Sequence, residues 1–208
     1  MTKTITLLAI STLSVVFTML AASSYADAAI YMKIPDVRGE VTTQGYEGAI
    51  ELNSFSFGVD REIKKFGEKG GTEDINIGVG ELQEVTIKKS LDSASAKLAQ
   101  FAINGNSLGQ AEIFFVEVVG SENPPMPYLQ YKLDRVFVKS WSTSGDADDR
   151  PTEEVAFYYN KISFVYTPGE ERNPDNVMSW DIKKKTTWDV IVQTILGALY
   201  PIRLEPQQ

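Results

Sequence analysis

The chain has 208 residues, of which 43% are hydrophobic and 23% charged, and its formal net charge is −8. One domain is expected at this length, with enough chain to bury a core without disulfides. Because the sequence has no cysteine and no histidine, disulfides, thiolate nucleophiles, Cys/His zinc sites and histidine triads are excluded. Histidine is also the usual general base near neutral pH, so the composition disfavours an enzyme. The acidic balance argues against nucleic acid as a partner, and no cofactor is expected.

The first 28 residues have the pattern of a signal peptide for export through the Sec pathway. Lys3 supplies a positive start, residues 5–22 are uncharged and mostly apolar, and small residues follow. Ala26 and Ala28 fit the A-x-A cleavage pattern, which makes Ala29 the first mature residue, and Ser24-Tyr25-Ala26 is a second option. The alternative is an uncleaved anchor, because about 18 such residues can just span a bilayer. We predict an N-terminal signal helix and a periplasmic or secreted location.

Strand patterns dominate the mature chain. Residues 50–57 have high β propensity, residues 82–89 alternate between apolar and polar, and residues 111–119 are apolar on both faces, as in a buried central strand. The alternation changes phase within residues 128–141, and again between residues 155–159 and 162–166. Each change of phase predicts a bulge, or a strand that bends from one sheet to another.

Two helices are predicted in the mature chain. The first follows Asp92 or Ser93 as N-cap and ends at Asn104-Gly105. The second lies near the C-terminus, with Thr187 as a cap and Pro201 as a stop. Its apolar positions at helical spacing are Trp188, Ile191, Val192, Ile195 and Leu199. Because strands outnumber helices, the fold class is expected to be mainly β, a sandwich or barrel with a helix packed outside.

The apolar stripe of the C-terminal helix leaves two alternatives open. Most such helices pack on their own domain. An exposed stripe would instead mark a contact with a partner or a membrane. Membrane contact is therefore expected only through the signal or through this helix.

Several polar patterns are weighed against ordinary surface roles. The acidic loop with Asp146, Asp148 and Asp149 fits a Ca²⁺ loop poorly. Glu153 and Glu154 are neighbours on a predicted strand, so they point to opposite faces and are unsuited to acting together in catalysis. Ser54 and Ser56 share one face, which is either a polar-lined inner surface or an ordinary exposed one. No catalytic or metal-binding residue is predicted.

Five segments occur in an order that identifies a family. They are residues 30–59, which begin "IYMKIPDVRGEV", residues 85–106 ("VTIKKSLDSASAKLAQFAINGN"), residues 128–145, residues 151–168 and residues 178–186 ("MSWDIKKKT"). Together they resemble the hemolysin-coregulated protein (Hcp) family, the tube subunits of type VI secretion systems. The resemblance implies two β-sheets that close into a barrel with one helix on the outside. The expected division is a signal peptide (1–28), an Hcp-like barrel (29–186) and a C-terminal amphipathic helix and tail (187–208).

The resemblance also implies assembly into hexameric rings that stack into a hollow tube and can carry small effectors in the lumen. Ser54 and Ser56 are candidate lumen-facing residues. The loop at residues 60–78 matches the family's extended loop, which is implicated in ring stacking. Its candidate stacking residues are Glu62, Lys64, Lys65, Glu68 and Lys69.

Two functions follow from this interpretation. The first is a non-enzymatic, exported tube or ring subunit, with further copies of itself, a secreted effector or another protein of the secretion machine as partners. The alternative is a monomeric exported binding or adhesion module that reuses the barrel.

Overall fold

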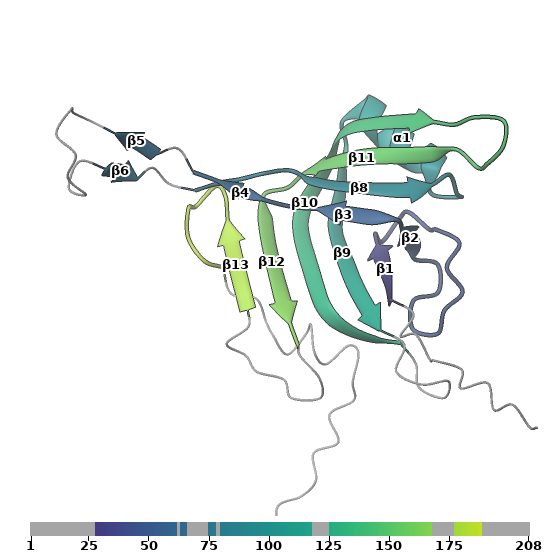
Figure 1. The fold of residues 1–208 in the computed structure, drawn as a ribbon, viewed down its shortest axis with the longest axis horizontal. Helices are drawn as coiled ribbons and strands as arrows, with labels where there is room; N and C mark the ends of the chain where they lie inside the picture. The colour runs from purple at the N-terminus through teal and green to yellow at the C-terminus, as the bar shows by residue number, and fades with distance from the viewer. Residues whose placement is uncertain are drawn as a thin grey trace, which may run out of the picture.

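The computed structural model describes residues 28–61, 63–65, 75–77, 80–117, 125–167 and 177–188. The elements in these ranges are β1 (Ala28–Lys33), β2 (Ile50–Leu52), β3 (Ser54–Ser56), β4 (Val59–Asp60), β5 (Ile63–Lys65), β6 (Ile75–Ile77), β7 (Glu81–Leu82), β8 (Val85–Ser90), α1 (Ser95–Asn104), β9 (Ser107–Glu117), β10 (Met126–Ser144), β11 (Thr152–Tyr158), β12 (Lys161–Tyr166) and β13 (Val177–Asp181). The described part of the chain is therefore mainly β with one helix, as predicted (Figure 1).

Nine of the strands form one antiparallel sheet. Its order is β2-β1-β9-β10-β11-β8-β3, with β12 paired to β10 and β13 paired to β12. Strand β9 lies between β1 and β10, and Ala111, Ile113 and Val116 in it are fully buried. The predicted buried central strand is confirmed, although it begins earlier than residue 111.

The long strand β10 bends in the middle, and its partner bends with it. The register of β10 shifts on either side of Val136, and Arg135 has a positive φ of 56°. Opposite this point, Tyr159 and Asn160 separate β11 from β12, and the Asn160 amide donates a hydrogen bond to Asp134 O. The two predicted changes of phase in the apolar alternation thus arise from one bend, because β10 pairs with β11 on one side of it and with β12 on the other. Figure 1 shows β10 curving at this point.

The first and last strands in the strand order of the sheet, β2 and β3, are neighbours in the sequence. β2 pairs with β1, whereas β3 pairs with β8 at the far end of the strand order. Asn53 separates them, and its amide donates to Lys88 O. The nine strands form a single bent sheet with β2 and β3 at its ends. The expectation of two sheets closed into a barrel therefore holds only in the coarser form of a curved, mainly β fold.

The core fills the inner side of this curved sheet. Alternate residues of β8 point into it, with Val85 and Ile87 fully buried. The same cluster contains Met32 from β1 and Phe157 from β11. The period of two that predicted these strands thus decides which side chains leave water.

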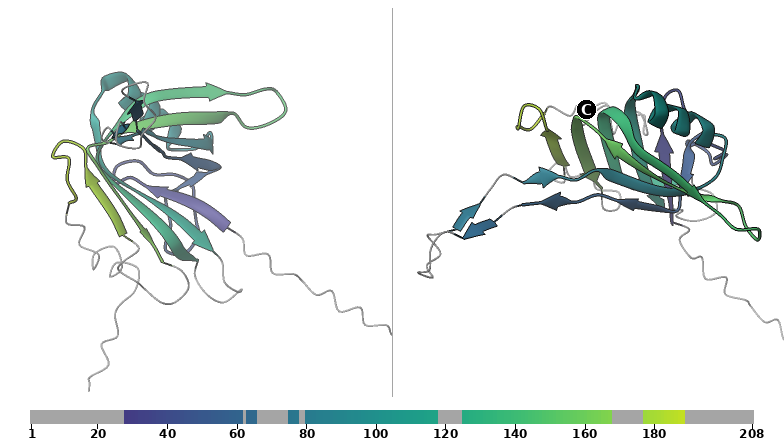
Figure 2. Two further views of the ribbon diagram at one scale, coloured as in Figure 1. Left: turned by 60° about the vertical axis from the view of Figure 1, so that its left-hand side comes forward. Right: turned by 90° about the horizontal axis from the view of Figure 1, so that it is seen from above.

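Helix α1 packs against β10, outside the sheet (Figure 2). Leu98 on its inner face is fully buried, whereas Ile103 on its outer face is 87% exposed. Gly105 ends the helix with φ 67°, as predicted from the Asn104-Gly105 pair. The predicted N-cap was wrong: the cap is Ala94, which has no capping side chain, and the Asp92 carboxylate accepts a hydrogen bond from the Ala94 amide in the turn before the helix.

Both terminal predictions fall largely outside the described residues. The signal helix and Ala26 lie before residue 28, and the C-terminal helix lies after residue 188 except for Thr187 and Trp188. Those two residues are not helical. Ala28 is the first residue of β1, where it pairs with Glu117, and Ala29 pairs with Val116. No helix among the described residues is long and apolar enough to cross a membrane.

Candidate assembly surfaces

The predicted stacking loop is built, where it is described, as an extended hairpin. At its base β4 pairs with β7, and farther out β5 pairs with β6. Figures 1 and 2 show these strands projecting well away from the sheet, at the end of the molecule opposite α1. Lys64 and Lys65 lie in β5, opposite Asn76 and Ile75. Glu62, Glu68 and Lys69 lie outside the described residues.

Polar contacts fix the base of this arm, which we define as residues 59–82. The Gln83 side chain donates a hydrogen bond to the Asp60 carboxylate over 2.9 Å. The Gln83 amide donates to Gly58 O, and Tyr159 Oη donates to Gln83 O over 2.7 Å. Because Tyr159 is buried in the core, the arm leaves the sheet from an anchored point.

The two candidate lumen residues lie on the exposed face of β3. Ser54 and Ser56 are both exposed, whereas Phe55 between them points the other way. Phe55 packs against Phe115 and Tyr131, with ring centroids 5.4 and 4.7 Å away. The predicted shared face of the two serines is therefore present, and the aromatic contacts on the other side hold it in place.

The same aromatic cluster joins β3 to the middle of the sheet. Tyr131 also contacts Phe164 of β12, at 5.4 Å between ring centroids. Burial among these rings raises the pKa of Tyr131. Aromatic pairs of this kind each add about 0.5–1.5 kcal/mol beyond the burial of their area.

A buried ionic network links α1 to β8 and β11. Lys89 and Glu153 are both fully buried, and their Nζ and Oε2 atoms are 3.0 Å apart. The Lys89 ammonium also lies 2.6 Å from the Asp92 carboxylate and donates to Ser95 Oγ and to Ser90 O. A buried ammonium needs such partners, because desolvation of an unpaired charge is costly. The network fixes the start of α1 on the sheet.

The next residues along the same two strands point to solvent and form an ordinary surface pair. Lys88 and Glu154 are 3.2 Å apart and more than half exposed. The prediction that Glu153 and Glu154 face opposite ways is thus confirmed. Sequence reasoning missed Lys89 as a core residue, although it continues the inward phase of Val85 and Ile87.

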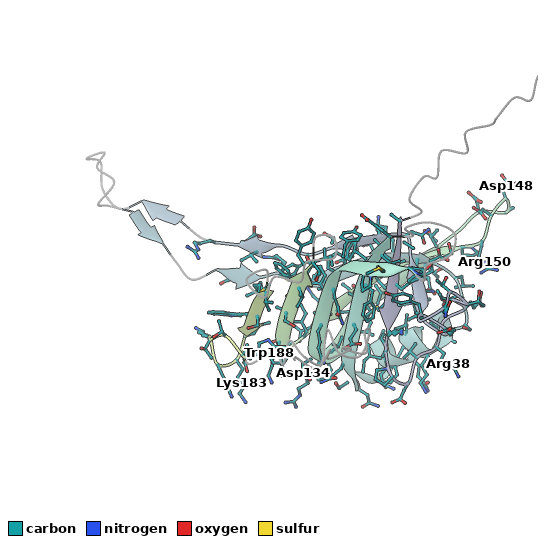
Figure 3. All side chains as sticks on the ribbon, turned by 90° about the horizontal axis from the view of Figure 1, so that it is seen from below. Arg38, Asp134, Asp148, Arg150, Lys183 and Trp188 are labelled. Atoms are coloured by element: carbon teal, nitrogen blue, oxygen red, sulfur yellow. The ribbon has the colours of Figure 1, made fainter. Side chains whose placement is uncertain are left out.

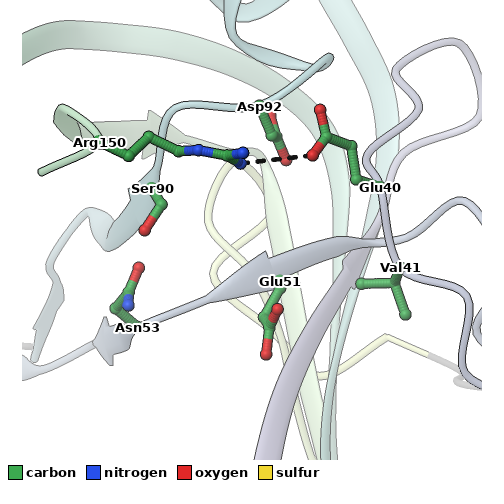
Figure 4. Close-up of a pocket in the computed structure, with 7 residues that line it drawn as sticks. All are labelled: Glu40, Val41, Glu51, Asn53, Ser90, Asp92 and Arg150. Carbon is green, nitrogen blue, oxygen red and sulfur yellow. Dashed lines mark hydrogen bonds and ion pairs between the residues drawn. The ribbon is translucent and has the colours of Figure 1, made fainter.

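A small polar cavity of about 250 Å³ lies beside this network (Figure 4). It is lined by Glu40, Val41, Glu51, Asn53, Ser90, Asp92 and Arg150. Arg150 Nη1 lies 3.4 Å from Glu40 Oε2 and 3.3 Å from Leu91 O. Glu40 also accepts from the Ser93 amide, and Asp92 is held by Lys89. Most of its charged groups are thus satisfied within the protein, and the cavity is smaller than the roughly 300–1,000 Å³ typical of ligand pockets.

A second, wider cavity of about 440 Å³ lies against the loop that follows β1. Lys33 and Glu112 line it from the sheet, and Arg38 and Glu47 from the loop. Hydrogen bonds from the backbone amides of Glu47 and Gly45 hold the pKa of Glu47 below its ordinary value. The Lys33 ammonium is itself bound to Gly45 O over 2.7 Å. The charge of Lys33 lowers the pKa of Glu47 further, so these two lining groups stabilise each other.

The acidic loop is an exposed turn between β10 and β11. Asp146, Asp148 and Asp149 are all exposed, and the Asp148 amide donates to the Asp146 carboxylate. Within the described ranges, no group of three or more acidic side chains is arranged to hold a metal ion. The arm and the exposed face of β3 are the candidate functional surfaces.

Comparisons with known proteins agree with this architecture. Residues 31–166 match the family model described as "Type VI secretion system effector, Hcp". Among solved structures, a type six secretion system protein is 24% identical with a TM-score of 0.65, and the alignment covers 77% of this chain and 99% of that one. Hcp1 from Salmonella typhimurium is 18% identical (TM-score 0.61), and a type VI secretion system effector from Yersinia pestis is 17% identical (TM-score 0.53), both with the same coverage.

No curated protein matches the chain. The structural likenesses, all below 25% identity, establish the shared fold, and the family model covers more than half of the sequence. The chain therefore belongs to the Hcp family of the type VI secretion system.

Proposed function

We propose that this protein is a non-enzymatic ring subunit, exported through its N-terminal signal, whose hexamers form a tube or hold a polypeptide in the ring lumen. The observation that carries the proposal is the family match across residues 31–166, a range that contains most of the curved sheet, α1 and the arm. Rings of identical subunits need two different surfaces that complement each other head to tail. The arm and the bent sheet offer such unlike surfaces on one chain.

Two details give the proposal its geometry. The arm supplies the stacking contact between rings, since it projects beyond the sheet (Figure 2). The exposed face of β3, with Ser54 and Ser56, lines the lumen with small hydroxyl side chains. Lys88 lies opposite Ser54 on the same face and pairs with Glu154, so the lining combines hydroxyls with one balanced ion pair and little apolar area.

The first test is light scattering after size exclusion on residues 29–208, with electron microscopy of the peak. A hexamer-sized species with a central pore is expected. A monomer at every concentration would rule out the ring, and the second function, an exported binding or adhesion module, would replace it.

Export is tested separately from assembly. Cleavage after Ala28 removes the residue that pairs with Glu117, whereas cleavage after Ala26 leaves β1 whole. N-terminal sequencing of exported protein should therefore find Asp27 or Ala29 as the first residue. Export that persists without a type VI machine and stops when Sec is blocked supports the signal. The reverse pattern would show that the machine itself carries the protein out.

A further inference from the structure

The outer face of the sheet is covered over part of each of its two halves. On β1 and β9, the loop at residues 38–49 covers Tyr31 and Phe114 with Tyr46 and Ala49. On β10 and β12, the outward residues Gln130, Ser163 and Val165 are also buried, at 7%, 0% and 5% exposure. The second half includes a hydroxyl, Ser163 Oγ, that is buried without a hydrogen-bond partner.

The chain arrives at this second half at its last described residue. After β13 it turns back, with a bridge between Asp181 and Thr186, and the Ser179 hydroxyl donates to Trp188 O over 2.8 Å. Ser179 pairs with Ser163 across the strands, so both lie on the outer face. Residues 186–188 thus run back beside β13 toward its first residue.

Trp188 fixes the direction in which the chain leaves. Its indole Nε1 donates to Ile162 O over 3.1 Å, and the Lys161 ammonium lies 5.0 Å from the centre of its ring. Lys161 is also 3.5 Å from Asp134. Figure 3 shows Trp188 and Asp134 close together beside β12. The indole therefore holds the chain against the outer face of β12.

We propose that residues 189–200 form a helix that packs in cis over the outer face of β10, β12 and β13. The apolar positions that follow Trp188 at helical spacing are Ile191, Val192, Ile195 and Leu199. From residue 191 to residue 199 a helix extends about 12 Å, which matches the roughly 10 Å from β13 to β10. The outward row beneath it contains Val165 and Val177, which pair with each other.

The occupant is the chain's own tail because no linker separates it from the anchored Trp188. A tethered segment binds at a high effective concentration, so it excludes a second copy or a membrane from the same face. In the ring proposed above, this face is consequently closed from within each subunit, and the ring contacts use other surfaces. The cis packing stands or falls independently of the ring.

The test uses thiol labelling of the protein as exported, since the chain has no cysteine of its own. The reporter is Val165→Cys. When Val165→Cys is combined with Ile195→Asp on the apolar stripe, a maleimide should label Cys at position 165 about tenfold faster or more, because the outer face of β12 is uncovered. Combined with Gln193→Asp, on the opposite side of the same helix, the rate should stay within about twofold. Equal rates in all three proteins would overturn the proposal.

A disulfide distinguishes the three occupants. The double variant Val165→Cys/Ile195→Cys should oxidise within one chain and run at monomer mass on a denaturing gel. Disulfide-linked dimers would instead assign the face to a second copy. Labelling of Val165→Cys that slows only when anionic lipid vesicles are added would assign it to a membrane. Either result overturns the cis packing.

Discussion

The Lys89 ammonium and the Glu153 carboxylate meet 3.0 Å apart, and both side chains are fully buried. One residue along each strand, Lys88 and Glu154 form the same type of pair at 3.2 Å in solvent. The two pairs lie on opposite faces of the sheet, and the buried Lys89 ammonium has Asp92, Ser95 and Ser90 O as further partners. They therefore offer a matched comparison of a buried and an exposed ion pair.

Lys89→Met should destabilise the protein by about 3–5 kcal/mol, because it leaves two carboxylates near the core without their cation. Lys88→Met should change stability by less than about 1 kcal/mol, since exposed pairs contribute little. Urea unfolding followed by fluorescence measures both values. Equal effects of the two substitutions would mean that the buried pair does not hold α1 to the sheet.

Helix α1 gives a second matched pair. Leu98→Ala removes a fully buried side chain and should cost about 2–5 kcal/mol. Ile103→Ala removes one that is 87% exposed and should stay within about 0.5 kcal/mol of the parent. The measurement is again urea unfolding. A large loss for Ile103→Ala would show that its exposed side chain is covered by another surface in solution.

Stability should fall in alkali because of Tyr159. Burial raises the pKa of Tyr159 well above its ordinary value of 10, and its hydroxyl donates to Gln83 O. Above pH 10 the unfolded chain loses this proton while the folded chain keeps it. The free energy of unfolding therefore falls by about 1.4 kcal/mol per pH unit from this group, with no effect below pH 10.

Tyr159→Phe should remove that part of the alkaline slope, at a cost of about 1 kcal/mol at pH 7 for the lost hydrogen bond. Tyr131 contributes in the same direction, so some slope remains. Urea unfolding at a series of pH values from 9 to about 11.5 measures the slope, with the exposed Tyr166→Phe as the control. A slope unchanged in Tyr159→Phe would contradict the assignment.

The arm can be shortened without touching the core. Its base keeps the pairs Val59 with Leu82 and Asp60 with Glu81, so residues 62–79 can be replaced by the two-residue turn Asn-Gly. The shortened protein should melt within a few degrees of the parent and form single rings that no longer stack. Calorimetry and electron microscopy check the two results. A control with the full-length arm, Lys64→Gln/Lys65→Gln, tests the effect of the two lysine charges alone. Stacks that persist without the arm would locate the stacking contact elsewhere.

Much of the fold could be predicted because strand and helix periodicities are local. The inward alternation of Val85 and Ile87 marked β8, and Asn104-Gly105 marked the end of α1. The change of phase near residue 135 marked the bend in β10. It did not predict that Tyr159 and Asn160 lie opposite this bend. The start of α1 was missed because the Asp92 side chain caps the preceding turn rather than the helix itself.

The candidate surfaces were harder to predict, since each depends on residues far apart in the chain. The sequence by itself determined that no cysteine or histidine chemistry is available, that the fold class is mainly β, and to which family the chain belongs. Only the tertiary structure decided that Lys89 meets Glu153, that β2 and β3 lie at opposite ends of one sheet, and that Trp188 is held against β12. Periodicity is set by neighbours a few residues away, whereas these contacts depend on strand register and on the bend of β10, which are settled only when the whole sheet assembles.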